Sequence, residues 1–304
     1  MSSEAITILV VPRDRFSVFP RCLEALYKFT QMPFRLVVVA GGTDGGTERY
    51  LMQLQAQKSN LKVVLVKPLL LQGEARNIAM SHAEERYCVV LENDTIVREN
   101  WLPPLLECMR EERAAAVMPL IFWHRGIHAA GCVFEERRKG DVVTLHHKIL
   151  YTEIRRRQID YPENHCILLD RKQLPDTHLF DDVEPFDVDL GLTLRKRKLI
   201  AFLEPRSVVT YTAPPRWEVC DVPLFRFRWD PALWEERNRL FMQKWGVQYD
   251  AEHKRASYRR QQLRIGPALW FPNRCTIELS NAGVFIERAI VSLATRVSRC
   301  WVER

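Results

Sequence analysis

The chain has 304 residues, of which 47% are hydrophobic, and it carries a formal net charge of +7. This length and apolar content can bury one large core or two modest ones. Residues 251–304 hold ten Lys and Arg against four Glu, a local charge of +6, so the first 250 residues are nearly neutral. A nucleic-acid-binding protein would be basic more evenly, and we therefore expect no nucleic-acid partner.

The N-terminus and the cysteines indicate the compartment. No run of residues approaches the roughly 18 apolar residues of a membrane span. The first residues lack the basic start and small-residue cleavage site of a signal peptide. The eight cysteines are scattered without a C-x-x-C pair, which favours free thiols in a reducing environment over a disulfide scaffold. We expect a cytoplasmic protein.

Three apolar runs rich in β-branched residues predict buried strands at residues 6–11, 35–39 and 61–66. Helical patterns lie between them. Pro20 is suited to open a helix with Leu23 and Leu26 on its apolar face, and residues 48–57 predict a second helix. Strands that alternate with helices at this spacing predict an α/β fold with a mostly parallel sheet.

A glycine-rich loop, residues 41–47, follows the second predicted strand. Glycine lets the backbone approach a ligand closely, so the loop is a candidate for ligand contact. A flexible turn is the alternative interpretation, because the loop matches neither a dinucleotide-binding nor a P-loop pattern.

The stretch from residue 73 to residue 94 predicts a helix, a short buried strand at 88–91, and then the triplet Glu92-Asn93-Asp94. Ligands of open α/β sheets bind beyond the carboxyl ends of the strands, which places the triplet in a crevice. Two carboxylates one residue apart suit Mg²⁺ or Mn²⁺ beside a phosphate. The alternative is a solvated turn that caps the next helix. A helix at 101–109 and a strand at 114–120 are predicted to follow.

Taken in order, these features resemble a family-2 glycosyltransferase with the GT-A fold, over residues 6–211. The resemblance implies a nucleotide-diphosphate sugar donor and a divalent cofactor, Mn²⁺ or Mg²⁺. It also implies a glycan, lipid-linked or protein acceptor. The implied nucleotide-sugar-binding residues are Pro12, Arg13, Asp44, Arg76 and Asn93, and the implied metal ligands are Glu92 and Asp94.

The chain departs from the family pattern at three positions. The family often has an acid directly after the second strand, where this chain has Ala40 and places Asp44 four residues later. The first acid of the triplet is Glu92 rather than aspartate. A histidine often ends the last strand of the catalytic domain and joins the metal. Tyr211 stands there in this chain, so this position is not expected to supply a third ligand.

The second half of the resemblance concerns the acceptor. Residues 127–134 resemble the small-residue strand below the sugar pocket, and residues 181–190 resemble the family's acidic helix start. A helix N-terminus stabilises a carboxylate as an anion. An inverting transfer needs a carboxylate that takes the proton from the acceptor hydroxyl. The resemblance assigns this role to Asp187, with Asp189 as the next choice; the alternative is that they only cap the helix.

We divide the chain into a catalytic domain, residues 1–213, and a C-terminal helical extension, residues 214–304. Prolines interrupt the aromatic-rich start of the extension, and residues 231–245 predict a helix that packs back on the catalytic domain. Residues 281–301 predict a basic amphipathic helix. Such a helix docks on the protein or a second subunit, or makes a peripheral contact with an anionic membrane.

Other features carry less weight. His124 and His128 have the spacing of a helical metal pair, but no cysteine pattern supports zinc. The basic runs at 155–157 and 195–198 are typical of solvated faces, with a phosphate on the acceptor as the alternative partner.

The leading hypothesis is therefore an inverting, metal-dependent glycosyltransferase. A nucleotidyltransferase is less favoured because no Gly-rich Arg-Lys loop follows the first strand. A catalytically silent GT-A-like protein that binds a glycan or partner is the main alternative, and a nucleic-acid or membrane-surface adaptor that acts through the basic tail is another.

Overall fold

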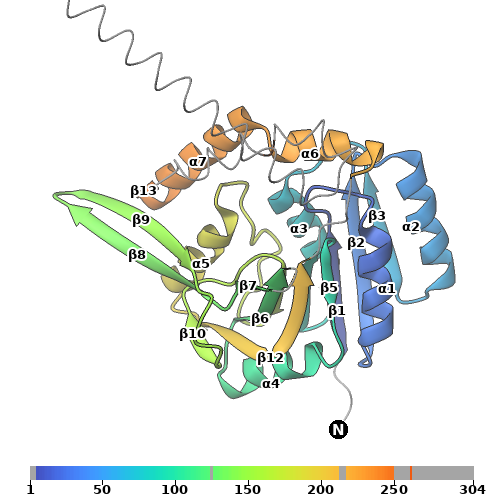
Figure 1. Cartoon of the computed structure of the whole chain (residues 1–304), viewed down its shortest axis with the longest axis horizontal. Helices are drawn as coiled ribbons and strands as arrows, with labels where there is room; N and C mark the ends of the chain where they lie inside the picture. The colour runs from blue at the N-terminus through green and yellow to red at the C-terminus, as the bar shows by residue number, and fades with distance from the viewer. Residues whose placement is uncertain (1–4, 124–125, 212–216, 250–260, 262–304) are drawn as a thin grey trace, which may run out of the picture.

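A computed structural model of the chain describes residues 5–123, 126–211, 217–249 and 261. Its centre is a ten-stranded sheet whose main path runs β10-β12-β6-β11-β4-β1-β2-β3 (Figure 1). One half of this sheet is parallel and consists of β1 (Ile6–Val11), β2 (Phe34–Gly41), β3 (Leu61–Val66) and β4 (Tyr87–Glu92). The connecting helices are α1 (Phe19–Phe29), α2 (Gly45–Gln57) and α3 (Gln72–Ser81). The predicted alternation of strands and helices is confirmed.

The other half of the sheet is mixed. It contains β6 (Ala116–Trp123), β10 (Arg157–Ile159), β11 (Cys166–Asp170) and β12 (Ala201–Tyr211), with β5 (Thr95–Val97) and β7 (Gly126–Ala129) paired at the side. Helix α4 (Leu102–Glu111) packs on β12 and β6. The strand expected at 114–120 begins two residues later and runs to Trp123.

Strand β11 runs antiparallel to both of its neighbours, β4 and β6. Cys166 therefore pairs with Leu91, and the amide of Glu92 donates to the carbonyl oxygen of His165 at 3.0 Å. An antiparallel strand brings its N-terminal end to the edge where the parallel strands end. The residues before β11 thus join the edge at which a ligand is expected.

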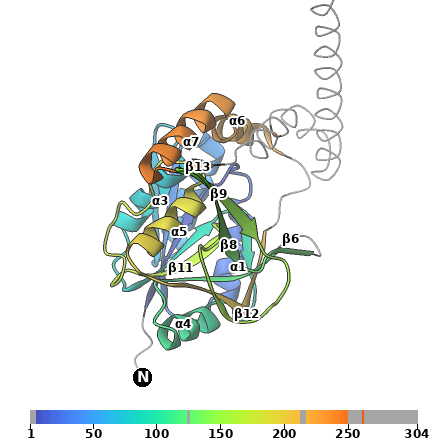
Figure 2. The ribbon, with the colours of Figure 1, turned by 90° about the vertical axis from the view of Figure 1, so that its left-hand side faces the viewer.

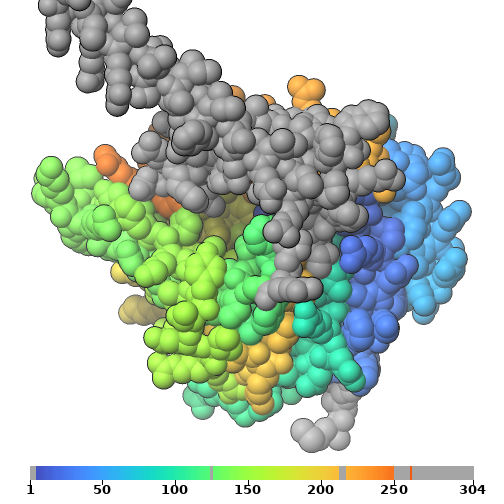
Figure 3. All heavy atoms as spheres, viewed as in Figure 1, coloured from blue at the N-terminus to red at the C-terminus, as the bar shows by residue number. Residues whose placement is uncertain are grey.

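A second sheet of three strands consists of β8 (Cys132–Lys139), β9 (Val142–Ile149) and β13 (Gln248–Tyr249). The β8–β9 hairpin projects from the body of the molecule (Figures 1 and 3). The single strand expected at 127–134 is wrong: β7 ends at Ala129 and β8 begins at Cys132. Gly131 lies between them at φ +104, a backbone conformation that favours glycine and turns the chain from one sheet to the other.

Helices α5 (Phe186–Lys196), α6 (Val222–Arg228) and α7 (Pro231–Trp245) complete the fold, with a short 3-10 helix η1 (Val219–Asp221) before α6. In both ribbon views α6 and α7 lie across the top of the molecule, opposite the end from which β1 starts (Figures 1 and 2).

The helix expected at 231–245 is confirmed. The prolines of the extension do not only interrupt its start, as expected, since Pro223 and Pro231 lie in the first turns of α6 and α7. Proline is favoured there because its missing N–H would have no helical partner. The helix expected at 281–301 lies outside the described residues. Within the described part, no helix is both long and apolar enough to cross a membrane.

Two apolar clusters hold these layers together. The larger one lines the main sheet, and the smaller one joins the hairpin, α5 and α7 through Cys132, Leu145, Tyr161, Val188, Phe241 and Tyr249. Gly191 of α5 faces this second cluster, and a Cβ there would lie 2.3 Å from Cβ of Tyr161 and 2.8 Å from the carbonyl oxygen of Asp160. This close approach fixes the position of α5, and therefore of its first turn, relative to residues 160 and 161.

We expect Gly191→Ala to lower the free energy of unfolding by about 1–3 kcal/mol, because overpacking outweighs the better helix propensity of alanine. Urea denaturation measures this. Gly45→Ala is the control: that glycine also lies in a helix, and its Cβ would come no closer than 3.7 Å to Nη1 of Arg49. Equal stabilities for the two variants would contradict the packing argument.

Candidate active site

Asn93, which is completely buried, holds the loop after β1 through three hydrogen bonds. Its Oδ1 accepts a hydrogen bond from the amide of Arg13 at 3.1 Å, and its Nδ2 donates to the carbonyl oxygen of Arg15 at 2.7 Å. Its own amide donates to the carbonyl oxygen of Val11. Asn93 was predicted to bind the nucleotide-sugar. The structure places its side chain on the loop instead, where it fixes the backbone that carries Arg13.

Asp221, at the end of η1, holds the same loop. This buried carboxylate accepts from the amides of Phe16 and Ser17 at 2.8 and 2.9 Å and from the Ser17 hydroxyl at 2.6 Å. The indole of Trp229 donates to Asp14 at 3.1 Å. The C-terminal extension therefore closes over the loop after β1 through hydrogen bonds to buried carboxylates.

Glu92 lies at the end of β4 and is 1% exposed. Its Oε1 accepts from Gln72 and from Nη2 of Arg76, each at 2.9 Å. Burial raises the pKa of Glu92 above its usual value, against the opposing effects of His165, Arg13 and Arg76. Burial also lowers the pKa of Arg76, which lies 4.3 Å from the ring centre of Phe186. Arg76 was expected near the phosphates; its side chain is completely buried and is not part of the cavity lining described below.

Arg13 reaches both acids of the triplet. Its Nη1 lies 3.3 Å from Oδ2 of Asp94 and its Nε lies 3.4 Å from Oε2 of Glu92. Nη1 also donates to the hydroxyl of Tyr211 at 2.8 Å, and the guanidinium lies 4.9 Å from the centre of that ring. Tyr211 ends β12, where a histidine was expected from the resemblance, and it holds Arg13 over the triplet.

His165 enters the same cluster from the start of β11. Its Nδ1 lies 2.8 Å from both oxygens of Glu163 and 3.8 Å from Oε2 of Glu92. Burial lowers the pKa of His165, but Glu163 and Glu92 raise it above its usual value. Burial raises the pKa of Glu163, but His165 and His128 bring it well below its usual range.

These residues fit a divalent ion. A ring nitrogen of His165 and carboxylate oxygens of Glu92 and Asp94 all lie within 4.8 Å of one another. Oε2 of Glu92, Oδ1 of Asp94 and Nε2 of His165 are buried without a hydrogen-bond partner. Buried polar atoms are nearly always hydrogen-bonded, so Oδ1 of Asp94 can accept a further partner, whereas Oε2 of Glu92 already lies 3.4 Å from Nε of Arg13. Carboxylates with one imidazole are a donor set that suits Mn²⁺.

A second group of the same kind consists of His128, Glu163 and His165. His128 had been paired with His124 in the zinc interpretation, but His124 lies outside the described residues. The structure instead brings Nε2 of His128 to 3.6 Å from Glu163. Because Glu163 bonds Nδ1 of His165, this second group positions the imidazole that belongs to the first group.

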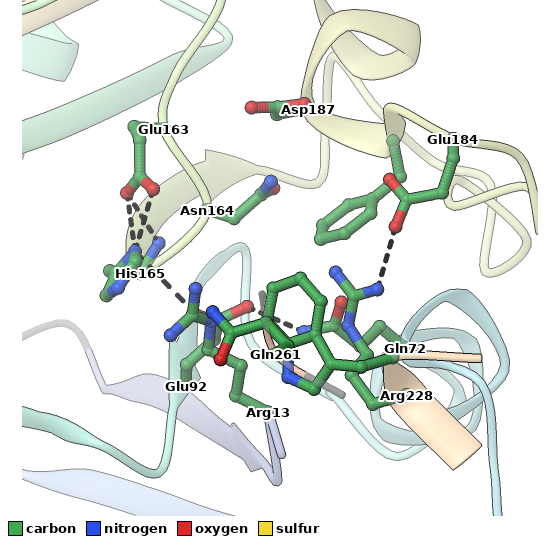
Figure 4. A pocket seen from close by; sticks show the side chains of 12 residues that line it. Arg13, Gln72, Glu92, Glu163, Asn164, His165, Glu184, Asp187, Arg228 and Gln261 are labelled. Carbon is green, nitrogen blue, oxygen red and sulfur yellow. Dashed lines mark hydrogen bonds and ion pairs between the residues drawn. The ribbon is translucent and has the colours of Figure 1, made fainter. Parts of the chain in front are cut away.

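A cavity of about 220 Å³ opens beside the cluster. Its lining is strongly charged and comes from the loop after β1, α3, β4, the start of β11, α5, α6 and the extension: Arg13, Gln72, Glu92, Glu163, Asn164, His165, Glu184, Phe186, Asp187, Arg228, Trp229 and Gln261. Asp187 lies across the cavity from Glu92 and Arg13 (Figure 4). Nη1 of Arg228, which also lines the cavity, pairs with Glu184 at 2.9 Å.

The two candidate bases of α5 face different ways. Asp187 lines the cavity, and its Oδ1 accepts from the amide of Val188 at 3.0 Å. Asp189 is buried and accepts from Nζ of Lys244 and Nε1 of Trp245, each at 2.7 Å. Burial raises the pKa of Asp189 even with these partners. The structure therefore places Asp189 at the contact with α7, away from the cavity lining.

The remaining predicted residues lie on the loops around the first two strands. Pro12 is buried directly after β1. Asp44 is the N-cap of α2, where it accepts from the amides of Gly46 and Thr47 at 2.8 and 3.2 Å. The glycine-rich loop is short, because Gly45 already begins the helix. The structure thus does not bring Asp44 to the cavity lining.

Sequence reasoning missed Glu163, Asn164 and His165. The rule for parallel sheets places ligand-binding residues only at the carboxyl ends of strands, and these three residues precede a strand. The available signal was the polar triplet directly before the apolar run Cys166–Asp170. An antiparallel strand delivers the residues before it to the same edge.

The sheet order and the position of the acid cluster define the GT-A fold of nucleotide-diphospho-sugar transferases. The sequence matches the family Glycosyl transferase family 2 over residues 7–167, and the chain belongs to this family.

Among solved structures, the chain is similar to a crystal structure of GalNAc-T7 with UDP, GalNAc and Mn²⁺, with a TM-score of 0.56 and 13% sequence identity. The match covers 75% of this chain and 49% of that one, so the chain spans about half the length of that protein. At this identity the likeness concerns the fold. A search of curated proteins finds no sequence match.

We expect Asn93→Ala to lower the free energy of unfolding by about 2–3 kcal/mol without any nucleotide, because buried loop groups lose their partners. Denaturation in urea measures this. Asp187→Asn is the control: its side chain lines the cavity, so its stability should change by less than about 1 kcal/mol. If Asn93→Ala left the free energy of unfolding unchanged, its side chain would not stabilise the loop, and ligand contact would be its remaining role.

Proposed function

We propose that the protein is an inverting, metal-dependent glycosyltransferase that moves a sugar from a nucleotide-diphosphate donor to an acceptor hydroxyl. The observation that carries this proposal is the cavity itself. Asp187 lies on one side of it, and Glu92 and His165 lie on the other, with Asp94 buried behind Arg13. In this proposal a general base and a metal-binding site face each other across the cavity.

The donor side consists of Glu92, Asp94 and His165, which would hold Mn²⁺ or Mg²⁺. When bound, such an ion offsets the charge of the diphosphate leaving group. Glu163 fixes the ring of His165 through Nδ1, an arrangement that commonly orients metal-binding imidazoles. Arg13 and Arg228 line the same cavity and supply positive charge for the phosphates. UDP and Mn²⁺ in the GalNAc-T7 structure support this choice of donor and cofactor.

The acceptor side centres on Asp187. The residue lies in the first turn of α5, where the helix N-terminus stabilises its carboxylate as an anion. It takes the proton from the acceptor hydroxyl as the diphosphate leaves, so that the hydroxyl attacks the sugar from the opposite face. One direct displacement of this kind inverts the configuration at the sugar carbon. The acceptor is a hydroxyl of a glycan, a lipid-linked sugar or a protein.

A catalytically silent GT-A-like protein that binds a glycan or a partner is the second candidate. The observation that favours it is the pairing of Arg13 with both Glu92 and Asp94, which neutralises the acids without an ion. Tyr211 in place of the family's histidine fits the same interpretation. The two candidates differ in whether a metal ion strengthens nucleotide binding.

We expect one of UDP, GDP, CDP and dTDP to raise the melting temperature when Mn²⁺ is present, since a ligand that binds only the folded state stabilises it by about 2.7 kcal/mol at a hundredfold excess over Kd. Asp94→Asn should lose the part of the shift that depends on Mn²⁺. Differential scanning fluorimetry measures both. A shift that is the same with and without Mn²⁺ in the wild type would remove the metal from the proposal.

We expect Asp187→Asn to lower kcat by about 10²–10⁴-fold, the usual contribution of a general base. Donor binding should be retained, because Asp187 lies opposite the metal ligands. Product formation and the thermal shift with the selected nucleotide measure the two effects separately. Asp189→Asn is the matched control, two residues along the same helix, and should lose stability rather than donor-saturated turnover. Normal turnover by the Asp187 variant would exclude it as the base.

A further inference from the structure

Arg13 contacts both carboxylates that would hold a metal ion. Its Nη1 and Nε lie 3.3 Å from Asp94 and 3.4 Å from Glu92. An ion bound to both carboxylates at about 2.1 Å, the usual Mg²⁺–oxygen distance, would come close to this guanidinium. Asp94 is 1% exposed and does not line the cavity, whereas Arg13 does. Arg13 therefore covers the second acid of the triplet.

We propose that Arg13 is a gate on the metal site. Its guanidinium neutralises Glu92 and Asp94 while the donor is absent, and a divalent ion binds these acids only when a nucleoside diphosphate enters and draws Arg13 to its phosphates. This inference rests on the proposed function and adds to it the order of binding: the ion and the diphosphate bind together, not the ion first.

The charges of the cluster support this order. Glu92 is paired with Arg76 at 2.9 Å, and Arg13 is the partner of Asp94. Together with Glu163, which bonds His165, the three acids and the two arginines carry a net charge of −1, so a divalent ion that entered this buried site beside a neutral His165 would leave it with an excess of one positive charge. Like charges at such distances repel strongly where water is excluded. A diphosphate brings the negative charge that offsets both the divalent ion and the guanidinium of Arg13.

The side chain of Arg13 is the more accessible of the two arginines on Glu92. Its backbone amide is fixed by Asn93, but its side chain remains 19% exposed. Its Nη1 donates a hydrogen bond to Oδ2 of Asp94 at 3.3 Å and its Nε pairs with Glu92 at 3.4 Å, and both contacts are longer than the hydrogen bond to Tyr211 at 2.8 Å. Arg76, by comparison, is 0% exposed and bonds Glu92 at 2.9 Å. Of the two arginines on Glu92, Arg13 is the one that an incoming anion meets.

A gate of this kind couples the two ligands. If the diphosphate removes a charge that opposes the ion, it raises the affinity for the ion, and by linkage the ion raises the affinity for the diphosphate by the same factor. Removal of the Arg13 charge should weaken this coupling mainly by strengthening the binding of the ion alone.

The test is direct Mn²⁺ binding, measured from the electron paramagnetic resonance signal of the free aquo ion. Without nucleotide, we expect Arg13→Gln to bind Mn²⁺ at least about tenfold more tightly than the wild type, because one buried positive charge is gone. Arg13→Lys keeps the charge and should stay near the wild type. Arg98→Gln is the matched control, since Arg98 is exposed and bonds Thr210 on the same sheet without touching the acids.

The same measurement with UDP, GDP, CDP and dTDP completes the design. In the presence of the nucleotide that binds, the wild type should approach the affinity of Arg13→Gln. If Arg13→Gln does not fold, Arg13→Met repeats the test, because it fills similar space without charge.

Equal Mn²⁺ affinity of the wild type and Arg13→Gln without nucleotide, together with nucleotide-dependent binding by both, would overturn the gate and leave the proposed function in place. An equal gain in Arg98→Gln would also overturn it, since the effect would then belong to net charge. If no variant binds Mn²⁺ under either condition, the gate and the metal-dependent function both fail.

Discussion

A carboxylate buried at the end of a central strand imposes the arrangement of this site. An unpaired buried charge costs several kcal/mol, so Glu92 requires partners, and they come from three different elements. Helix α3 supplies Gln72 and Arg76, the loop after β1 supplies Arg13, and the start of β11 supplies His165. Each element must be in place before Glu92 is satisfied. The requirement that stabilises the fold therefore also assembles the site.

The C-terminal extension takes part in this site rather than only covering it. Asp221 holds the loop that carries Arg13, and Arg228 and Trp229 form part of the cavity wall. Asp189 ties α5 to α7 and so fixes the helix whose first turn presents Asp187. Two acids on one helix thus divide the work: one is buried in a contact between helices, and the other faces the substrate space.

Periodicity was enough to predict the parallel half of the sheet, the helices between its strands and α7. The rule for ligands at strand ends predicted Glu92, and only the resemblance to the family added Arg13 and Asp187 to the same site. Periodicity could not choose between Asp187 and Asp189, which lie about 200° apart around the helix, because the choice depends on where α7 packs. Asp44 shows the same limit, since an acid before a helix serves equally as an N-cap or a ligand contact. His165 was missed because only the pairing of β11 with β4 reveals its position.

The two arginines on Glu92 show why residue type alone does not define a role. Both are cations beside the same carboxylate, and both were expected near the nucleotide. Arg76 is enclosed between α3, Glu92 and the rings of Phe180 and Phe186, so its charge is a fixed part of the fold. Arg13 stands at the cavity wall, where an incoming anion can reach it. In the proposed mechanism the two cations have different roles: Arg76 is a permanent partner of the buried acid, and Arg13 is the one that would turn to the ligand.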